Sequence, residues 1–405
     1  MSPPDSARSE SARSESAPGS TSSLRTANQR RVLDVLRRHR VGHKSASKVR
    51  LTQADLARTT GLAPATVSNI VREFAAAGLV EVEPGSGRRG ASVRLAARAG
   101  LVCGIDFGHS HLSVAIGDLT GHVLSEQSRS LEQSHHHEEG LTYAAEMLKR
   151  ELDELGSEHS ALRAVVVGLP APVIDDVVRS AAILPGWVGV NARQVAEQHL
   201  NCPVHIENDA NLGALAEHLV GVARGHADSI FLKLSSGVGA GIIIDNELFH
   251  GSVGAAGEVG HLTVNEQGPV CRCGSRGCLE AYASSGSVLE LMSSQMPGAT
   301  IDEVVAAAQN GNASALRSLE DASFHLGWGI GSLVNILNPS IVVVGGDLAR
   351  AGELLLEPAR VGLRRHALDA VASTPIVISK LGHRASLVGA VLLAAERTDL
   401  LPAAD

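Results

Sequence analysis

The chain has 405 residues, enough for two to four domains at about 100–200 residues each. Hydrophobic residues make up 44% and charged residues 19%, which excludes a largely disordered or fibrous protein. No apolar run approaches the roughly 18–20 residues of a membrane helix, and the first residues form no apolar signal segment. We therefore expect a cytoplasmic protein with no membrane partner. The formal net charge of −8, taken alone, argues against nucleic acid as a partner.

The charge is distributed unevenly along the chain. Residues 1–98 contain 17 Lys and Arg against 8 Asp and Glu, a balance of +9, whereas the remainder carries −17. This asymmetry predicts a basic module, residues 23–98, in front of an acidic globular body, residues 99–398. Residues 1–22 are Ser-rich and repeat the pentapeptide SARSE, and they have few large apolar side chains. We expect them to form a disordered tail.

The pattern of residues 23–98 predicts three helices followed by a β-hairpin. Thr52 and Asp55 have the spacing of a capping box at the start of the second helix. Pro64 suits the first turn of the third helix, where its missing N–H costs nothing. That helix has a predicted buried stripe at helical spacing, formed by Val67, Ile70, Val71 and Phe74. Helices in this order, with a hairpin at 79–95, indicate a winged helix-turn-helix.

The second helix of a helix-turn-helix enters the DNA major groove and contacts base edges with its N-terminal residues. The predicted DNA contacts are Ala65, Thr66, Ser68, Asn69 and Arg72 on the third helix, and Arg88 and Arg89 on the hairpin tip. The +9 balance favours operator DNA as the partner. A winged helix that docks another protein is the alternative.

From residue 100 onward, short β-branched runs alternate with Ala-rich helical patterns. The runs 101–107, 112–117 and 122–127 predict an antiparallel meander. The later strands are separated by helices, so we expect an α/β body with mixed sheets in two lobes. Cys103 and Cys202 lie at strand edges and are predicted to be small core residues.

Three polar or Gly-rich motifs follow predicted strands. Asp106 and Gly108 lie at a turn between two strands. Asp209, in the run Glu-Asn-Asp-Ala-Asn, could act as a base on a hydroxyl, although such a run is also typical of a helix cap. Gly237 and Gly239 belong to a Gly-rich loop that could cradle phosphate with backbone N–H groups or form a tight β-turn.

The segment 261–278 contains one His and three Cys at metal-ligand spacing. The candidate ligands are His261, Cys271, Cys273 and Cys278. This set matches a closed tetrahedral Zn²⁺ site, which is structural because no position is left for water. Such a site would hold the loops of Glu258 and Glu280 side by side. Three incidental thiols are the alternative.

Over residues 23–398 the sequence resembles the ROK family of repressors, open reading frames and sugar kinases, most specifically in the zinc segment. The N-terminal part, with Leu24, Arg25 and Asn28, resembles its repressor branch. The resemblance implies a two-lobed actin-like (ribonuclease H-like) sugar kinase fold. It also implies a sugar site made by Asn208, Asp209, Glu258, His261 and Glu280. Asp209 would be the counterpart of the kinase base, and the two phosphate loops would contain Asp106, Gly108, Gly237 and Gly239.

The departures from the kinase pattern lie in the phosphate loops. His109 and Ser110 stand where kinase members have Gly and Thr, and Ser235-Ser236 stand where Gly-Thr is usual. Asp347 adds a negative charge where a nucleotide would bring more. Together these changes predict that nucleotide binding is lost and the sugar site is retained.

The sequence therefore favours a sugar-responsive DNA-binding regulator, a repressor of carbohydrate uptake or metabolism genes. We expect a homodimer or a dimer of dimers on a pseudo-palindromic operator, since two-fold protein symmetry is mirrored in the site. A sugar or sugar phosphate would be the effector. One alternative is an ATP-dependent sugar kinase with Asp209 as catalytic base. Another is a body that serves only as a sugar-blind scaffold for dimerisation.

Overall fold

The computed structural model describes residues 21–38, 51–85, 90–96, 99–132, 136–179, 184–398 and 400. The chain divides into two compact units. One consists of the residues up to Ala96 together with those from Asp399 onward, and the other is Ala97–Thr398. Most of the predicted tail and the two hairpin arginines, Arg88 and Arg89, lie outside the described residues.

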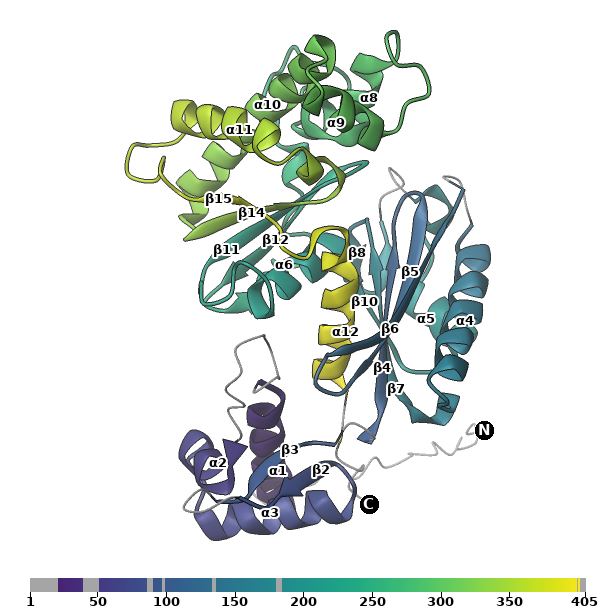
Figure 1. Ribbon diagram of the computed structural model, residues 1–405, viewed down its shortest axis with the longest axis vertical. Coiled ribbons are helices and arrows are strands. Elements are labelled where there is room, and N and C mark those ends of the chain that lie inside the picture. Colours follow the sequence, from purple (N-terminus) through teal and green to yellow (C-terminus); the bar gives the residue numbers. More distant parts are fainter. Residues whose placement is uncertain are drawn as a thin grey trace, which may run out of the picture. The chain divides into compact units, whose positions relative to one another are not determined.

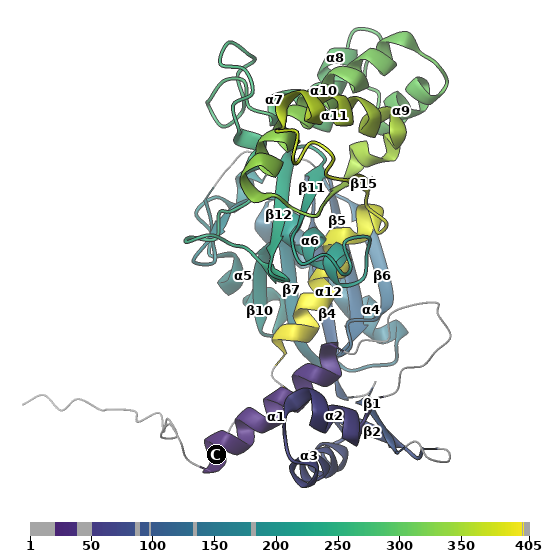
Figure 2. The same ribbon diagram turned by 90° about the vertical axis from the view of Figure 1, so that its left-hand side faces the viewer.

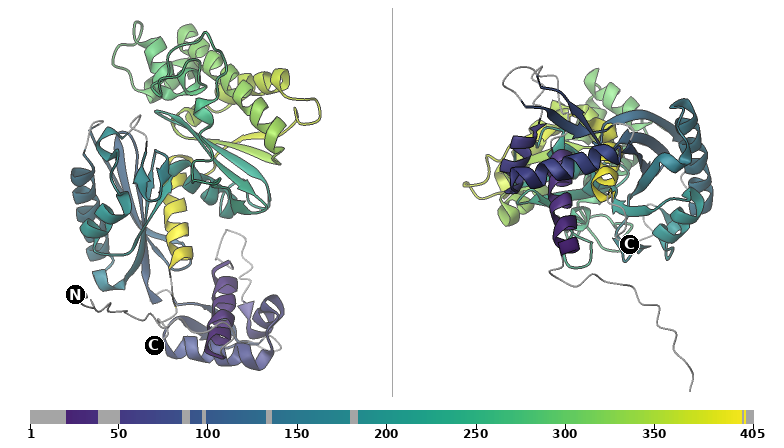
Figure 3. Two further views of the ribbon diagram at one scale, coloured as in Figure 1. Left: turned by 180° about the vertical axis from the view of Figure 1, so that it is seen from behind. Right: turned by 90° about the horizontal axis from the view of Figure 1, so that it is seen from below.

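The first unit combines three helices with a small antiparallel sheet of order β1-β3-β2 (Figure 3). Its elements are α1 (Thr21–Arg38), β1 (Leu51–Thr52), α2 (Gln53–Thr60), α3 (Pro64–Ala76), β2 (Val80–Glu83) and β3 (Ser92–Leu95). The predicted capping box of Thr52 and Asp55 at the start of α2 is confirmed. The predicted stripe of α3 is buried, as expected for its spacing: Val67, Ile70, Val71 and Phe74. Arg25 on α1 forms an ion pair with Glu73 on α3 at 2.6 Å.

The second unit contains two five-stranded sheets with the same topology (Figure 1). The first sheet, of order β10-β7-β4-β5-β6, consists of β4 (Leu101–Phe107), β5 (His111–Asp118), β6 (Val123–Ser130), β7 (Leu162–Leu169) and β10 (Val204–Asn208). The second, of order β13-β12-β11-β14-β15, consists of β11 (Ser229–Leu234), β12 (Val238–Ile244), β13 (Glu247–Leu248), β14 (Ile341–Gly345) and β15 (Ile376–Ile378). In each sheet an antiparallel meander continues into parallel strands. The predicted mixed α/β body is confirmed. A separate hairpin is formed by β8 (Val173–Ile174) and β9 (Val177–Val178).

The two sheets of this unit are linked by the packing of two helices, α6 (Asp209–Leu219) and α12 (Ala385–Arg397), against each other. The other helices of the unit are α4 (His137–Glu154), α5 (Ala192–Leu200), α7 (Glu280–Ala283), α8 (Ser285–Met292), α9 (Ile301–Gln309), α10 (Ala313–Leu337) and α11 (Glu353–His366). Helices α6 and α12 lie side by side, α12 against β4 and β7 of the first sheet and α6 against β11 and β12 of the second (Figures 1 and 2). Ala216 of α6 packs against Val388 and Leu392 of α12 in a small apolar cluster. The pair therefore forms the packed link between the two lobes.

Several elements differ from the sequence patterns. Helix α10 runs for 25 residues, and α11, which was not predicted from the sequence, has Pro358 inside it. Cys103 and Cys202 are buried free thiols, as expected for small core residues.

Within the described part of the chain, no helix is both long and apolar enough to cross a membrane.

Candidate metal centre and ligand-binding site

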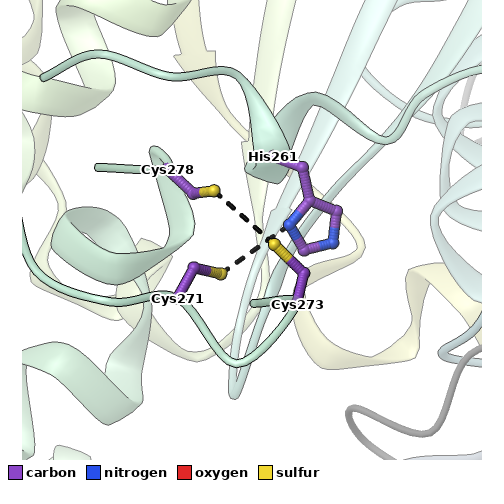
Figure 4. A group of neighbouring side chains, drawn as sticks. All are labelled: His261, Cys271, Cys273 and Cys278. Atoms are coloured by element: carbon purple, nitrogen blue, oxygen red, sulfur yellow. Dashed lines mark hydrogen bonds between the residues drawn. The ribbon is translucent and has the colours of Figure 1, made fainter. Parts of the chain in front are cut away.

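The one His and three Cys of the predicted zinc segment come together in the second unit (Figure 4). Their ligand atoms all lie within 4.8 Å of one another; the residues are His261, Cys271, Cys273 and Cys278. Cys273 Sγ is 3.7 Å from Cys278 Sγ, and Cys271 Sγ is 3.8 Å from His261 Nδ1. Tetrahedral zinc with Zn–S bonds of about 2.3 Å separates its sulfur ligands by about 3.8 Å. The observed cluster fits such an ion.

His261 can serve two predicted roles because its ring nitrogens face different groups. Nδ1 faces the thiol of Cys271, whereas Nε2 lies 3.8 Å from Glu258 Oε2. A metal bound through Nδ1 would leave Nε2, which faces Glu258, available to contact a sugar in the predicted site. It would also fix the orientation of the imidazole.

All five residues of the predicted sugar site line one cavity: Asn208, Asp209, Glu258, His261 and Glu280. Each is placed by the start or end of a local element. Asn208 ends β10, Asp209 begins α6 and Glu280 begins α7, while Glu258 precedes the short turn that holds His261. Asp209 and Glu280 are buried polar residues, 6% exposed each. The structure therefore brings together polar side chains from three separate segments, 208–209, 258–261 and 280.

Asn208 also acts as the N-cap of α6. Its Oδ1 accepts hydrogen bonds from the backbone N–H groups of Ala210 and Asn211, at 2.9 and 3.2 Å. The helix-cap alternative is thus right for this residue, and its Nδ2, which donates to the carbonyl of Ala171 at 3.4 Å, remains on the cavity wall.

Lys233, which was not predicted from the sequence, also lines the cavity. Its Nζ donates to Asp209 Oδ2 at 2.7 Å and to Ser386 Oγ at 3.1 Å, and the Ser386 hydroxyl donates to the backbone carbonyl of Asp209 at 2.8 Å. These contacts join β11, α6 and α12. The sequence did contain a signal: Lys233 is the one charged residue of a mostly apolar strand, and a buried lysine needs a partner.

Electrostatics support an ion pair between Lys233 and Asp209. Burial raises the pKa of Asp209 and the nearby Asp106 adds to that rise, whereas Lys233 lowers it. Burial disfavours the charged form of Lys233, but the carboxylates of Asp209 and Asp106 outweigh it and raise the pKa of Lys233. The ammonium group therefore stays charged and compensates the buried carboxylate.

A second cavity shares Asp209, Lys233 and Glu280 with the first. Gly108 and His109 of the first predicted phosphate loop line it, together with Asp347.

In the first predicted phosphate loop the imidazole of His111 lies against Gly108. A Cβ on Gly108 would overlap the ring of His111, whose Nε2 lies 3.4 Å from Asp106 Oδ2. His111 thus covers the glycine that a phosphate would have to approach. Comparison with the kinase pattern pointed to His109 and not to His111, which lies outside the compared loop positions.

The second predicted phosphate loop is a tight hairpin turn. Ser235 N donates to Gly237 O at 2.9 Å, and β12 begins at Val238, so Gly239 belongs to the strand and pairs with Lys233. A Cβ on Gly241 would overlap the carbonyl of Ala210. Close packing of α6 against the strand therefore accounts for that glycine.

The predicted DNA contacts on α3 lie on the face opposite its buried stripe. Ala65, Asn69 and Arg72 are exposed, and Thr66 and Ser68 are half-buried. Small polar side chains and one arginine are thus accessible on a single helix face, as base and phosphate contacts require.

Residues 102–397 match the ROK family. The chain belongs to the ROK family. Residues 25–90 match the MarR family, in agreement with the winged helix-turn-helix of the first unit. A xylose repressor from Caldicellulosiruptor bescii is 30% identical over 365 residues, which cover 85% of this ROK protein and 91% of the relative.

Two solved structures place the fold in context. The crystal structure of a ROK family transcriptional regulator, described as a homologue of the E. coli Mlc protein, covers 92% of this chain and 96% of its own, with a TM-score of 0.76 at 22% identity. A ROK family glucokinase from Streptomyces griseus, in complex with glucose and AMPPNP, covers 73% of this chain and 100% of its own, with a TM-score of 0.65 at 29% identity. The predicted winged helix-turn-helix and actin-like sugar kinase fold are confirmed.

Proposed function

We propose that this ROK protein is a sugar-responsive, DNA-binding transcriptional regulator that represses carbohydrate uptake or metabolism genes. The observation that carries the proposal is the presence, in one chain, of a winged helix with an exposed polar face and a carboxylate-lined cavity. The similarity to a xylose repressor over 85% of the chain supports the same reading.

Sugar recognition would use the hydrogen-bond acceptors of the cavity. Carboxylates of Asp209, Glu258 and Glu280 accept hydrogen bonds from hydroxyl groups, and a buried charged acceptor makes stronger bonds than a neutral one. Burial raises the pKa of Glu258, and the carboxylates of Asp209 and Glu280 add to the rise, while His261 opposes it. His261 would contribute its Nε2 edge.

We further propose that the cluster at 261–278 holds Zn²⁺ through His261, Cys271, Cys273 and Cys278. With four protein ligands the ion has no open position, so it would act as a structural tether rather than a Lewis acid for substrate. Its function would be to hold the segment of Glu258, three residues before His261, next to the segment of Glu280.

The switch would be a population shift between two lobe arrangements. The cavity takes Asn208 and Asp209 from the end of β10 and the start of α6, and Lys233 and Ser235 from the second sheet and its turn. A sugar that binds one arrangement more tightly changes the equilibrium; equal affinity would change nothing. In a homodimer or dimer of dimers, that shift would change the spacing of two winged helices on a pseudo-palindromic operator.

Substitutions on α3 test the DNA half of the proposal. Asn69→Ala should cost about 1–3 kcal/mol of operator binding and relax base preference, because Asn69 would contact a base edge. Arg72→Ala should weaken binding to all sequences and reduce the salt dependence by about one phosphate contact. Fluorescence anisotropy with duplexes selected by the protein from a random library measures both effects.

Lys149→Ala, an exposed change on α4 of the second unit, is the matched control. Full affinity and unchanged base preference in Asn69→Ala would contradict the proposed recognition helix.

We also expect no ATP-dependent sugar phosphorylation. The ring of His111 covers Gly108, where the kinase pattern would place a phosphate. Lys233 is bound to the carboxylate of Asp209, which would have to accept the proton of the sugar hydroxyl. A coupled ADP-release assay over a panel of aldoses should give no turnover above the background of Asp209→Ala. Turnover in the parent chain that is lost in Asp209→Ala would instead establish the sugar kinase alternative.

A further inference from the structure

Negatively charged side chains dominate the walls of the two joined cavities. Within the described residues that line them, the carboxylates are those of Asp209, Glu258, Glu280, Glu290 and Asp347. Lys233 and Arg272 are the lysine and arginine of the same walls. A ligand therefore meets more negative than positive charge.

Both cationic side chains are already bound to acceptors of the protein. Lys233 donates to Asp209 and Ser386, as described above. Arg272 donates from Nε to Glu280 Oε1 at 3.0 Å and from its terminal nitrogen to the carbonyl of Ser236. A phosphate group would have to share these cations with the acceptors that they already neutralise, because no further lysine or arginine stands beside them on the described walls.

Some of the backbone N–H groups in and beside the two loops are also engaged. Four donors that could have formed an anion-binding nest have acceptors within the chain. They are Gly108 N to His111 O at 2.8 Å, Ser235 N to Gly237 O at 2.9 Å, Val238 N to Glu280 Oε2 at 3.1 Å and Asp347 N to Ser235 Oγ at 3.3 Å. These four donors would have to leave their present acceptors before they could bind a phosphate.

We propose that the effector is an uncharged sugar and that this site rejects the phosphorylated form of the same sugar. This inference rests on the proposed function and narrows its ligand class. Hydroxyl groups donate to carboxylates without adding charge, whereas a phosphate ester brings up to two negative charges near Glu280 and Asp347. The repulsion between a phosphate and these carboxylates is stronger in a partly buried site than in water, because the effective dielectric constant is lower.

Calorimetry with matched pairs of ligands tests the inference on the full-length protein. The probes are D-xylose, D-glucose and N-acetyl-D-glucosamine, each compared with its own phosphate ester, with and without millimolar MgCl₂. We expect at least one free sugar to bind about 100-fold more tightly than its ester, in either condition.

Two charge-neutralising substitutions in the second cavity identify the source of the selectivity. Asp347 and Glu290 line that cavity and are absent from the sugar-site set. Asp347→Asn/Glu290→Gln should therefore leave the affinity for the free sugar unchanged and reduce its preference over the ester about 10-fold. Glu247→Gln, the same change at an exposed position on β13, should leave both affinities unchanged.

Three outcomes would overturn the inference. The first is an ester that binds as tightly as its free sugar, and the second is an ester that does so only with magnesium, which would make the carboxylates a metal site for phosphate. The third is a preference for the free sugar over its ester that is undiminished in Asp347→Asn/Glu290→Gln. Binding by an ester alone is an extreme case of the first outcome and would still uphold the proposed function, whereas binding by none of the probes would overturn that function as well.

Discussion

Lys233→Met is expected to lower the free energy of unfolding of the second unit by about 3–5 kcal/mol, since it leaves a buried carboxylate without its counter-charge. Asp209 is 6% exposed, and Lys233 is its hydrogen-bonded cation at 2.7 Å. Loss of Lys233 also removes a donor to Ser386 on α12, so that the hydrogen-bonded link from β11 to α6 and α12 is lost.

Urea unfolding followed by tryptophan fluorescence measures this loss in the intact chain. The two tryptophans, Trp187 and Trp328, both lie in the second unit, so the signal reports on that unit alone. Lys233→Met/Asp209→Asn should recover most of the stability, because the double variant buries no unpaired carboxylate at this position.

Lys149→Met is the matched control, since Lys149 pairs with Asp153 at 3.4 Å on an exposed helix surface. It should change stability by less than about 0.5 kcal/mol. If Lys233→Met is as stable as the parent chain, or if the double variant shows no recovery, the buried ion pair is not what holds these three elements together.

Removal of the proposed zinc ion is expected to weaken sugar binding at least about 10-fold without abolishing operator binding. The ion would fix the segments of Glu258 and Glu280, both on the cavity wall, whereas the winged helix belongs to the other unit. Cys271→Ser removes one thiolate ligand and should yield protein with less than stoichiometric zinc.

Elemental analysis for zinc and calorimetry with the free sugars measure the two effects on the same preparation. Cys202→Ala, a change at a buried thiol outside the cluster, should retain both zinc and sugar affinity. Full sugar affinity in a preparation verified to be zinc-free would show that the loops keep their geometry without the ion.

Local signals in the sequence predicted much of the fold. The capping box at Thr52 and the stripe of α3 depend on neighbours within one or two turns, and both are confirmed. The grouping of the zinc segment was equally predictable, because three thiols within eight residues and one His nearby have the spacing of a metal site, and the structure brings the four side chains together.

Features that depend on distant neighbours could not be predicted. Lys233 meets Asp209 and Ser386 across separations of 24 and 153 residues, and nothing near Lys233 in the sequence identifies these partners. The ring of His111 lies over Gly108 with its Nε2 3.4 Å from Asp106 Oδ2, a contact that comparison of loop patterns does not contain. Helix α11 continues through Pro358, and its buried face packs into the apolar core beside β11 and β14 of the second sheet.

The most direct test of the account is whether a free sugar changes operator affinity through the cavity. Anisotropy titrations of a selected operator duplex, in the presence of each free sugar, should show at least a 10-fold change for one sugar, or about 1.4 kcal/mol. Glu258→Gln should bind the operator normally without sugar and lose the response, since Glu258 lines the cavity but not the winged helix. An unchanged affinity with every sugar, or an intact response in Glu258→Gln, would contradict the account and favour a sugar-blind scaffold.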